Sequence, residues 1–141
     1  MASKKSFTAD EWKILQWAVM DAGSHVTASD YPGLWDSFKE ASGGSRFLTM
    51  LQSSDNELVR DLARDQARKG DPLTKDRADL ASDVVLDRIR EAVALVETKD
   101  PGDVEDFKLM VLGVAQIVAE EVGGTSEKES EAVARIKDAL G

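Results

Sequence analysis

The sequence predicts an all-α protein built as a single compact bundle of about six helices. No segment alternates apolar and polar residues as a half-buried strand does, and Phe107–Ala119 has only Lys108 and Gln116 as polar residues. A helix that is apolar on most of its surface needs other helices on nearly every side, so we expect this one at the centre of a bundle. The 141 residues suit a single domain, residues 1–141.

The first helix is expected from Ala9 to Ala22, after a flexible segment of residues 1–7. Thr8–Glu11 has the pattern of a capping box, in which each side chain binds a free amide of the first turn. Phe7 and Trp12 have the spacing of a hydrophobic staple around that cap. These signals place the start of the helix at Ala9.

Two large side chains of this helix, Trp17 and Met20, fall outside its main apolar face. They need a second neighbour, and large apolar residues left outside a core often mark an interface. The polar stretch Gly23–Asp30 is expected to be a loop in which His25 is exposed.

The second helix is expected from Pro32 to Gln52, with a kink where Gly43–Gly44 interrupts it. Apolar residues keep one helical phase across these glycines: Leu34, Phe38, Ala41, Leu48 and Leu51. A capping box at Ser54–Glu57 then opens a third helix, which is expected to end near Lys69.

The last three helices are expected over Lys75–Glu97, over Asp103–Val122 and after a capping box at Ser126–Glu129. The final helix should bury Val133, Ile136 and Leu140. The first and fifth helices also resemble each other, because Glu11–Leu15 aligns without gaps with Asp106–Met110. This likeness suggests two pseudo-symmetric halves around one core.

The amino-acid composition excludes several classes of function. The chain has no cysteine, which excludes disulfides and thiolate sites and fits the cytoplasm. With 27 acidic against 18 basic side chains, its surface should on average repel nucleic acid. No signal peptide is recognisable, and the most apolar segment is shorter than the roughly 20 residues of a membrane span, so no membrane association is expected.

Charged stripes occur on two predicted helices. Four acids recur every fourth residue opposite the apolar face of the fourth helix: Asp79, Asp83, Asp87 and Glu91. They indicate a contact surface for a basic partner, a loosely held divalent cation or, more simply, a solvated face. The third helix carries a stripe of the opposite charge, formed by Arg60, Arg64 and Arg68. Acidic residues lie three or four positions from these arginines, so exposed ion pairs are a simpler explanation of the stripe than a phosphate-binding site.

A divalent cation is the only cofactor that the sequence suggests. Acids near the ends of the first and fifth helices would supply oxygen ligands if two halves packed about an axis. The candidates are Asp21, Asp30, Glu120, Glu121 and Glu129. Helix capping and solvation are the simpler explanation of these residues.

No catalytic motif is recognisable. The single histidine has no nucleophile or carboxylate placed by a known pattern, and the glycine pairs lack the strand and lysine of a phosphate loop. We therefore expect a protein that is not an enzyme.

The segment Leu109–Leu140 resembles the C-terminal part of the TerB-like, tellurite-resistance-type helical proteins of bacteria. The matching residues are Val114–Ala115, Val118–Ala119, Gly123, Ser126, Glu129, Ala132, Ile136 and Leu140. The resemblance implies a pseudo-symmetric bundle and a bacterial stress-related setting. The family's acidic residues are associated with metal binding, but Val122 precedes Gly123 where the family has an Asp-Gly pair.

Three functions remain open. The first is a non-enzymatic cytoplasmic protein that acts through contacts with a protein partner, with a homodimer as one form, through Trp17 and Met20 or the acidic stripe. The second is a divalent-cation-binding TerB-like protein. The third is an enzyme with an unrecognised carboxylate site.

Overall fold

The computed structural model describes residues 2–27, 38–68, 82–122 and 127–141, and its regular structure within these ranges is helical. The helices are α1 (Ala9–Thr27), α3 (Ser42–Leu51), α4 (Glu57–Gln66), α5 (Ser82–Lys99), α6 (Val104–Ile117) and α7 (Glu127–Leu140). Short 3₁₀ turns, η1 (Lys4–Ser6) and η3 (Pro101–Asp103), precede α1 and α6, and a π-helical turn, η4 (Val118–Val122), continues α6. The predicted all-α bundle is confirmed.

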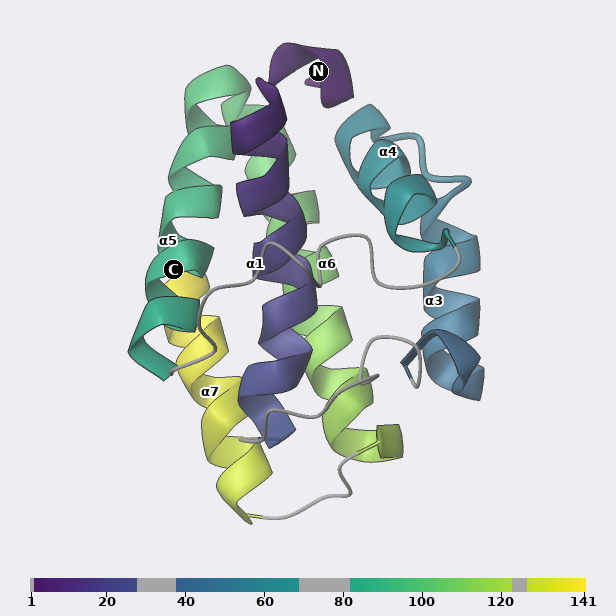
Figure 1. The fold of residues 1–141 in the computed structure, drawn as a ribbon, viewed down its shortest axis with the longest axis vertical. Coiled ribbons are helices and arrows are strands. Elements are labelled where there is room, and N and C mark those ends of the chain that lie inside the picture. Colours follow the sequence, from purple (N-terminus) through teal and green to yellow (C-terminus); the bar gives the residue numbers. More distant parts are fainter. Residues whose placement is uncertain (1, 28–37, 69–81, 123–126) are drawn as a thin grey trace.

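The long helices α1, α5, α6 and α7 pack side by side with α1 in contact with the other three (Figure 1). The helices α3 and α4 pack on each other and lie on the opposite side of α1 from α5, against α6 (Figure 1). In the described part of the chain, no helix is both long enough and apolar enough to cross a bilayer.

The start of α1 is as predicted. The Thr8 amide donates to Glu11 Oε1 at 2.9 Å, and the Glu11 amide donates to Thr8 Oγ1 at 3.1 Å. The rings of Phe7 and Trp12 lie 5.9 Å apart between centroids, which is the expected staple. Residues 2–7, which we expected to be flexible, instead contain the turn η1 and bury Ala2 and Phe7.

The end of α1 differs from the prediction. The helix continues to Thr27, so residues 23–27 of the expected loop are helical and its last three residues lie outside the described ranges; His25 is buried at 5% exposure. The polar sequence was misleading because α5 and α7 flank this part of α1. Met20, one of the predicted contact residues, is buried at 1% exposure.

The helix predicted from Pro32 to Gln52 is interrupted, but not at its glycines. Ala41 has extended backbone angles (φ −64°, ψ 142°), and α3 begins after it and runs through Gly43–Gly44. Residues 38–40 are helical, and the part of the prediction before them lies outside the described residues. A Cβ on Gly44 would overlap the Phe38 carbonyl oxygen. The absence of a side chain at Gly44 therefore allows the backbone to turn sharply between residue 38 and α3.

The remaining boundaries are close to those predicted, with one correction. Asn56, not Ser54, caps α4: its side-chain oxygen accepts from the Val59 amide at 3.2 Å. The ranges of α5, α6 with η4, and α7 agree with the predicted helices where they are described. Ile136 and Leu140 are buried and Val133 is half-buried on α7.

The most enclosed helix is α1 rather than α6. Its residues Leu15, Ala18, Val19 and Ala22 are fully buried, whereas Leu109 on α6 is 63% exposed. The expectation of a central Phe107–Ala119 helix is therefore wrong for one face of α6, which no described helix covers at Leu109. The two helices whose sequences resemble each other, α1 and α6, are direct neighbours, and duplication stays a prediction.

Candidate functional site

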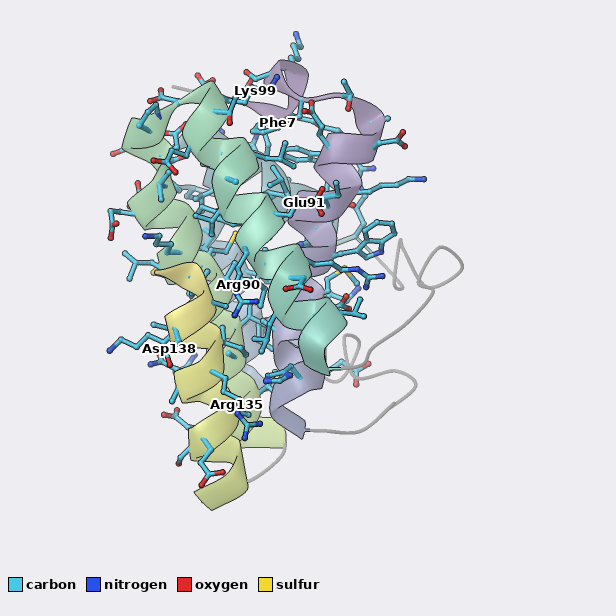
Figure 2. All side chains as sticks on the ribbon, turned by 90° about the vertical axis from the view of Figure 1, so that its left-hand side faces the viewer. Phe7, Arg90, Glu91, Lys99, Arg135 and Asp138 are labelled. Atoms are coloured by element: carbon cyan, nitrogen blue, oxygen red, sulfur yellow. The ribbon has the colours of Figure 1, made fainter. Side chains whose placement is uncertain are left out.

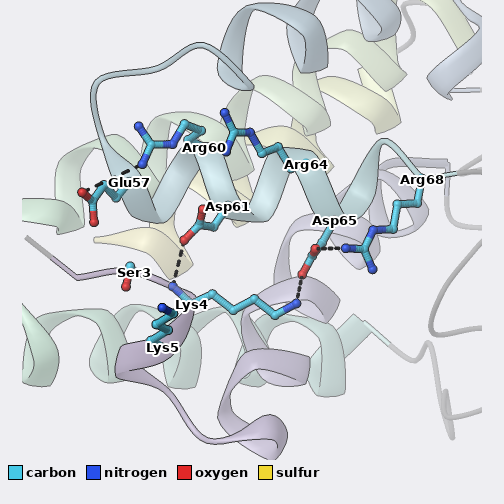
Figure 3. A pocket seen from close by; sticks show the side chains of 9 residues that line it. All are labelled: Ser3, Lys4, Lys5, Glu57, Arg60, Asp61, Arg64, Asp65 and Arg68. Carbon is cyan, nitrogen blue, oxygen red and sulfur yellow. Dashed lines mark hydrogen bonds and ion pairs between the residues drawn. The ribbon is translucent and has the colours of Figure 1, made fainter.

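A pocket of about 500 Å³ lies open to solvent between the N-terminal segment and α4 (Figure 3). Charged side chains line most of it. The lining residues, which together define what we call the basic groove, are Ser3, Lys4, Lys5, Glu57, Arg60, Asp61, Arg64, Asp65 and Arg68.

Hydrogen bonds hold the N-terminal segment beside α4. The Ala2 amide donates to Asp103 Oδ2 at 2.7 Å, and the Lys4 amide donates to Asp61 Oδ2 at 3.0 Å. The Lys4 ammonium lies 2.8 Å from Asp65 Oδ2 (Figure 3). Backbone and side-chain contacts therefore fix the position of this segment, and with it that of the adjacent Lys5.

The orientation of α4 is set by its N-terminal cap. Asn56 accepts from the first turn of α4, and its Nδ2 donates to Asp103 at 3.2 Å and to Asp106 at 3.0 Å. Asp103 thus binds both Asn56 and the Ala2 amide. One buried carboxylate at the start of α6 connects the two walls of the basic groove.

Asp65 anchors the other end of the groove. Its Oδ2 accepts from Trp12 Nε1 at 2.8 Å and from Gln16 Nε2 at 3.4 Å, and Arg68 lies 3.3 Å from its Oδ1. Burial alone would raise the pKa of the Asp65 carboxyl. Hydrogen bonds from Lys4 and Trp12 and the charges of Lys4 and Arg68 outweigh burial, so the pKa is lowered and Asp65 is ionised at neutral pH.

The groove carries more positive than negative charge. Five of its lining side chains are basic and three are acidic, in a chain of net charge −9. Lys4 and Arg68 are paired with Asp65, and Arg60 lies 3.9 Å from Glu57. Within the described residues, Lys5 and Arg64 have no ion pair, so they are the cations most available to a ligand.

The predicted metal-ligating acids are not brought together where the structure describes them. Asp21 is fully buried and pairs with Arg88 at 3.0 Å, whereas Glu120 is exposed. Asp30 lies outside the described residues, as do the side chains of Glu121 and Glu129. Within the described ranges, no group of three or more histidine or acidic side chains is arranged to hold a metal ion.

Two polar side chains of α1 are enclosed without hydrogen bonds. Among the residues that the structure describes, neither ring nitrogen of His25 has a hydrogen-bond partner, and burial followed by the charge of Arg135 lowers its pKa. The Trp17 Nε1 also has no partner, while the Arg88 guanidinium lies over the Trp17 ring at 5.1 Å from its centroid. Trp17 is half-buried, so only part of this predicted contact residue faces solvent.

The acidic stripe lies on α5. Asp87 and Glu91 are exposed, and Arg90 pairs with Asp87 at 2.9 Å. Figure 2 shows Arg90 and Glu91 on α5. Asp79 and the side chain of Asp83 lie outside what the structure describes.

The sequence did not identify the basic groove as a site. The arginine stripe is visible in the sequence, but the groove forms only because residues 3–5 pack beside α4, and they were expected to be flexible. Leu109, which is 63% exposed, was not identified as a surface residue because it belongs to the apolar run Phe107–Ala119, and Met50, which is 62% exposed, was not singled out either.

Comparison with protein-family models, with curated proteins and with solved structures gave no match. The TerB-like resemblance therefore stays a prediction based on the residues that carry it.

Proposed function

We propose that this protein is a non-enzymatic binding protein that holds an acidic segment of a protein partner in the basic groove. The proposal rests on one observation: basic side chains outnumber acidic ones around an open pocket, although the chain as a whole is acidic. We expect the protein to work in the cytoplasm, in the stress-related setting that the resemblance implies.

The arrangement of the cations supports this proposal. Arg60 and Arg64 are four residues apart, so their side chains leave one face of α4 about 6 Å apart along its axis, and Arg68 follows just beyond the end of this helix. Lys5 stands on the opposite wall of the groove. A segment that carries carboxylates at a similar spacing would pair with several of these cations at once.

A protein segment suits the groove better than a nucleic acid. Glu57 and Asp61 lie among the cations and would repel a backbone with a phosphate at every nucleotide. The net charge of −9 adds repulsion at longer range. The longer-range repulsion acts on an acidic peptide as well, but a peptide whose carboxylates are separated by neutral residues can place those neutral residues opposite Glu57 and Asp61.

Binding of this kind should be weak, fast and sensitive to salt. Ion pairs exposed to water contribute about 0–1 kcal/mol each, and ions in solution screen them. Opposite charges on the two partners mainly raise the rate of association. The protein would then act as a reversible contact in a larger assembly.

A labelled acidic peptide tests this proposal by fluorescence anisotropy. The probe is a helical peptide of about 20 residues with glutamate at every fourth position, and the comparison probe is a single-stranded oligonucleotide of equal charge. We expect the peptide to bind, and Lys5→Glu with Arg64→Glu to weaken it by about tenfold or more. Both residues are exposed, so the folded state should tolerate these changes.

The matched control is Arg46→Glu with Lys137→Glu, which reverses two exposed charges outside the groove. It should leave peptide affinity almost unchanged. Equal loss in both double variants, or tighter binding of the oligonucleotide than of the peptide, would contradict the proposal.

A further inference from the structure

The exposed acids of α5 are not used by the basic groove of the same molecule. Asp87 and Glu91 project from α5, and α4 lies on the other side of α1 from α5 (Figure 1). One copy of the chain therefore presents basic side chains on α4 and acidic side chains on α5, two helices that lie on different sides of α1.

We propose that the acidic segment held in the basic groove is α5 of a second copy of this chain. This inference rests on the proposed function and names its partner. It places Asp87 and Glu91 of one copy against the arginine face of α4 in the next copy.

The spacing of the charges supports the pairing. Asp87 and Glu91 are four residues apart, as are Arg60 and Arg64. Both pairs lie on regular α-helices, so each pair spans about 6 Å along its axis. Two helices laid side by side can therefore form two ion pairs without distortion of either helix.

The acidic face also contains a basic residue, and the basic face also contains acidic residues. Arg90 lies between the acids of α5, and Glu57 and Asp61 lie among the arginines of α4. A uniformly basic face would meet repulsion from Arg90. A mixed face on each side can instead place Arg90 near an acid of α4.

The contact joins α4 of one copy to α5 of the next, and because these helices lie on different sides of α1 in each copy we propose a head-to-tail contact. Such a contact leaves one basic and one acidic face unoccupied at the ends of each assembly, and a further copy can add there. The expected product is a reversible series of short oligomers whose mean size rises with protein concentration, rather than a fixed dimer.

Salt should affect this association in two ways. At about 0.1 M salt the Debye length is about 10 Å, so repulsion between whole molecules of charge −9 is damped while ion pairs in contact persist. At about 1 M salt the Debye length is about 3 Å, and exposed ion pairs are weakened as well. Self-association should therefore be seen at the lower concentration and lost at the higher one.

Sedimentation velocity on two charge-reversed variants tests the inference. The groove variant is Lys5→Glu with Arg64→Glu, and the stripe variant is Asp87→Lys with Glu91→Lys. Each variant alone should lose the concentration-dependent rise in sedimentation coefficient, because its two faces then carry charge of the same sign and repel each other. An equimolar mixture should regain it, because the reversed faces of the two variants attract each other.

The control variant, Glu40→Lys with Glu105→Lys, reverses two exposed acids outside α4 and α5 and should associate as the native chain does. Thermal melts check that all variants fold. A native chain that is monomeric at every concentration, or variants whose mixture stays monomeric, overturns the inference. If the acidic peptide still binds the groove under those conditions, the proposed function survives and only the identity of its partner is wrong.

Discussion

Asp65 and His25 are both buried, but only Asp65 has partners for its polar atoms. The Asp65 carboxylate accepts hydrogen bonds from Trp12 and Gln16 and pairs with Lys4 and Arg68. His25 has none for either ring nitrogen. The pKa of each group is lowered, with opposite consequences: Asp65 stays charged and His25 stays neutral at pH 7.

This difference predicts how stability depends on pH. His25 has an ordinary pKa of 6.5 and a lower one in the folded protein, because of burial and then Arg135. As pH falls below 6.5 the unfolded chain takes up a proton first, so the free energy of unfolding should fall until the folded pKa is passed. The steepest slope from one such group is about 1.4 kcal/mol per pH unit.

His25→Leu should remove this pH dependence. Leucine loses no hydrogen bond at a site that offers none, so stability at pH 7 should be nearly unchanged or higher. Urea unfolding at pH 7, 6 and 5 measures the effect in both proteins. A native chain whose stability does not fall over this range would show that His25 titrates as an exposed histidine does.

At the scale of single elements, α3 depends on a close approach that only glycine permits. A Cβ at Gly44 would overlap the carbonyl oxygen of Phe38, which belongs to the backbone and cannot rotate away. At Gly113 the nearest atoms belong to the ring of Phe47, which is a half-buried side chain that can move. The two glycines should therefore differ in their tolerance of alanine.

Gly44→Ala should destabilise the protein by about 1–3 kcal/mol, although alanine is favoured over glycine in a helix by about 1 kcal/mol. Gly113→Ala should cost less, because the steric clash can relax. Urea denaturation provides the measurement, and Ser45→Ala at an exposed position of the same helix is the control. Higher stability of Gly44→Ala than of the native chain would mean that α3 does not approach residue 38 as described.

The elements also indicate what a sequence can predict. Caps and apolar periodicity depend on neighbouring residues, so the start of α1 and the extents of α6 and α7 were predictable. The break at Ala41 was not, because residues 38–51 keep one apolar phase and the break arises from contact between Phe38 and Gly44. Likewise, the burial of His25 depends on α5 and α7, and the basic groove depends on anchoring of residues 2–4 by Asp61, Asp65 and Asp103.

At the scale of the whole molecule, the helices divide into two groups. α1, α5, α6 and α7 contact one another extensively, whereas α3 and α4 pack mainly on each other and on one side of α6, with further contacts from α4 to η1 and α1. Regions with fewer contacts to the rest of a protein open at lower free energy than its core. We expect α3 and α4 to open as a unit while the other four helices stay folded.

Asn56 links these two groups, which makes it the place to test the division. Its side chain caps α4 and donates to Asp103 and Asp106 at the start of α6, and it is buried at 6% exposure. Asn56→Ala removes the cap, at a cost of about 1–2 kcal/mol, and leaves two carboxylates with fewer donors. Hydrogen exchange should then accelerate in α3 and α4, with little change in α1 and α7.

Asp55→Ala, at an exposed neighbouring position, is the control. Uniform acceleration in all the described helices would mean that the molecule opens only as a whole, and the basic groove would then be as rigid as the core.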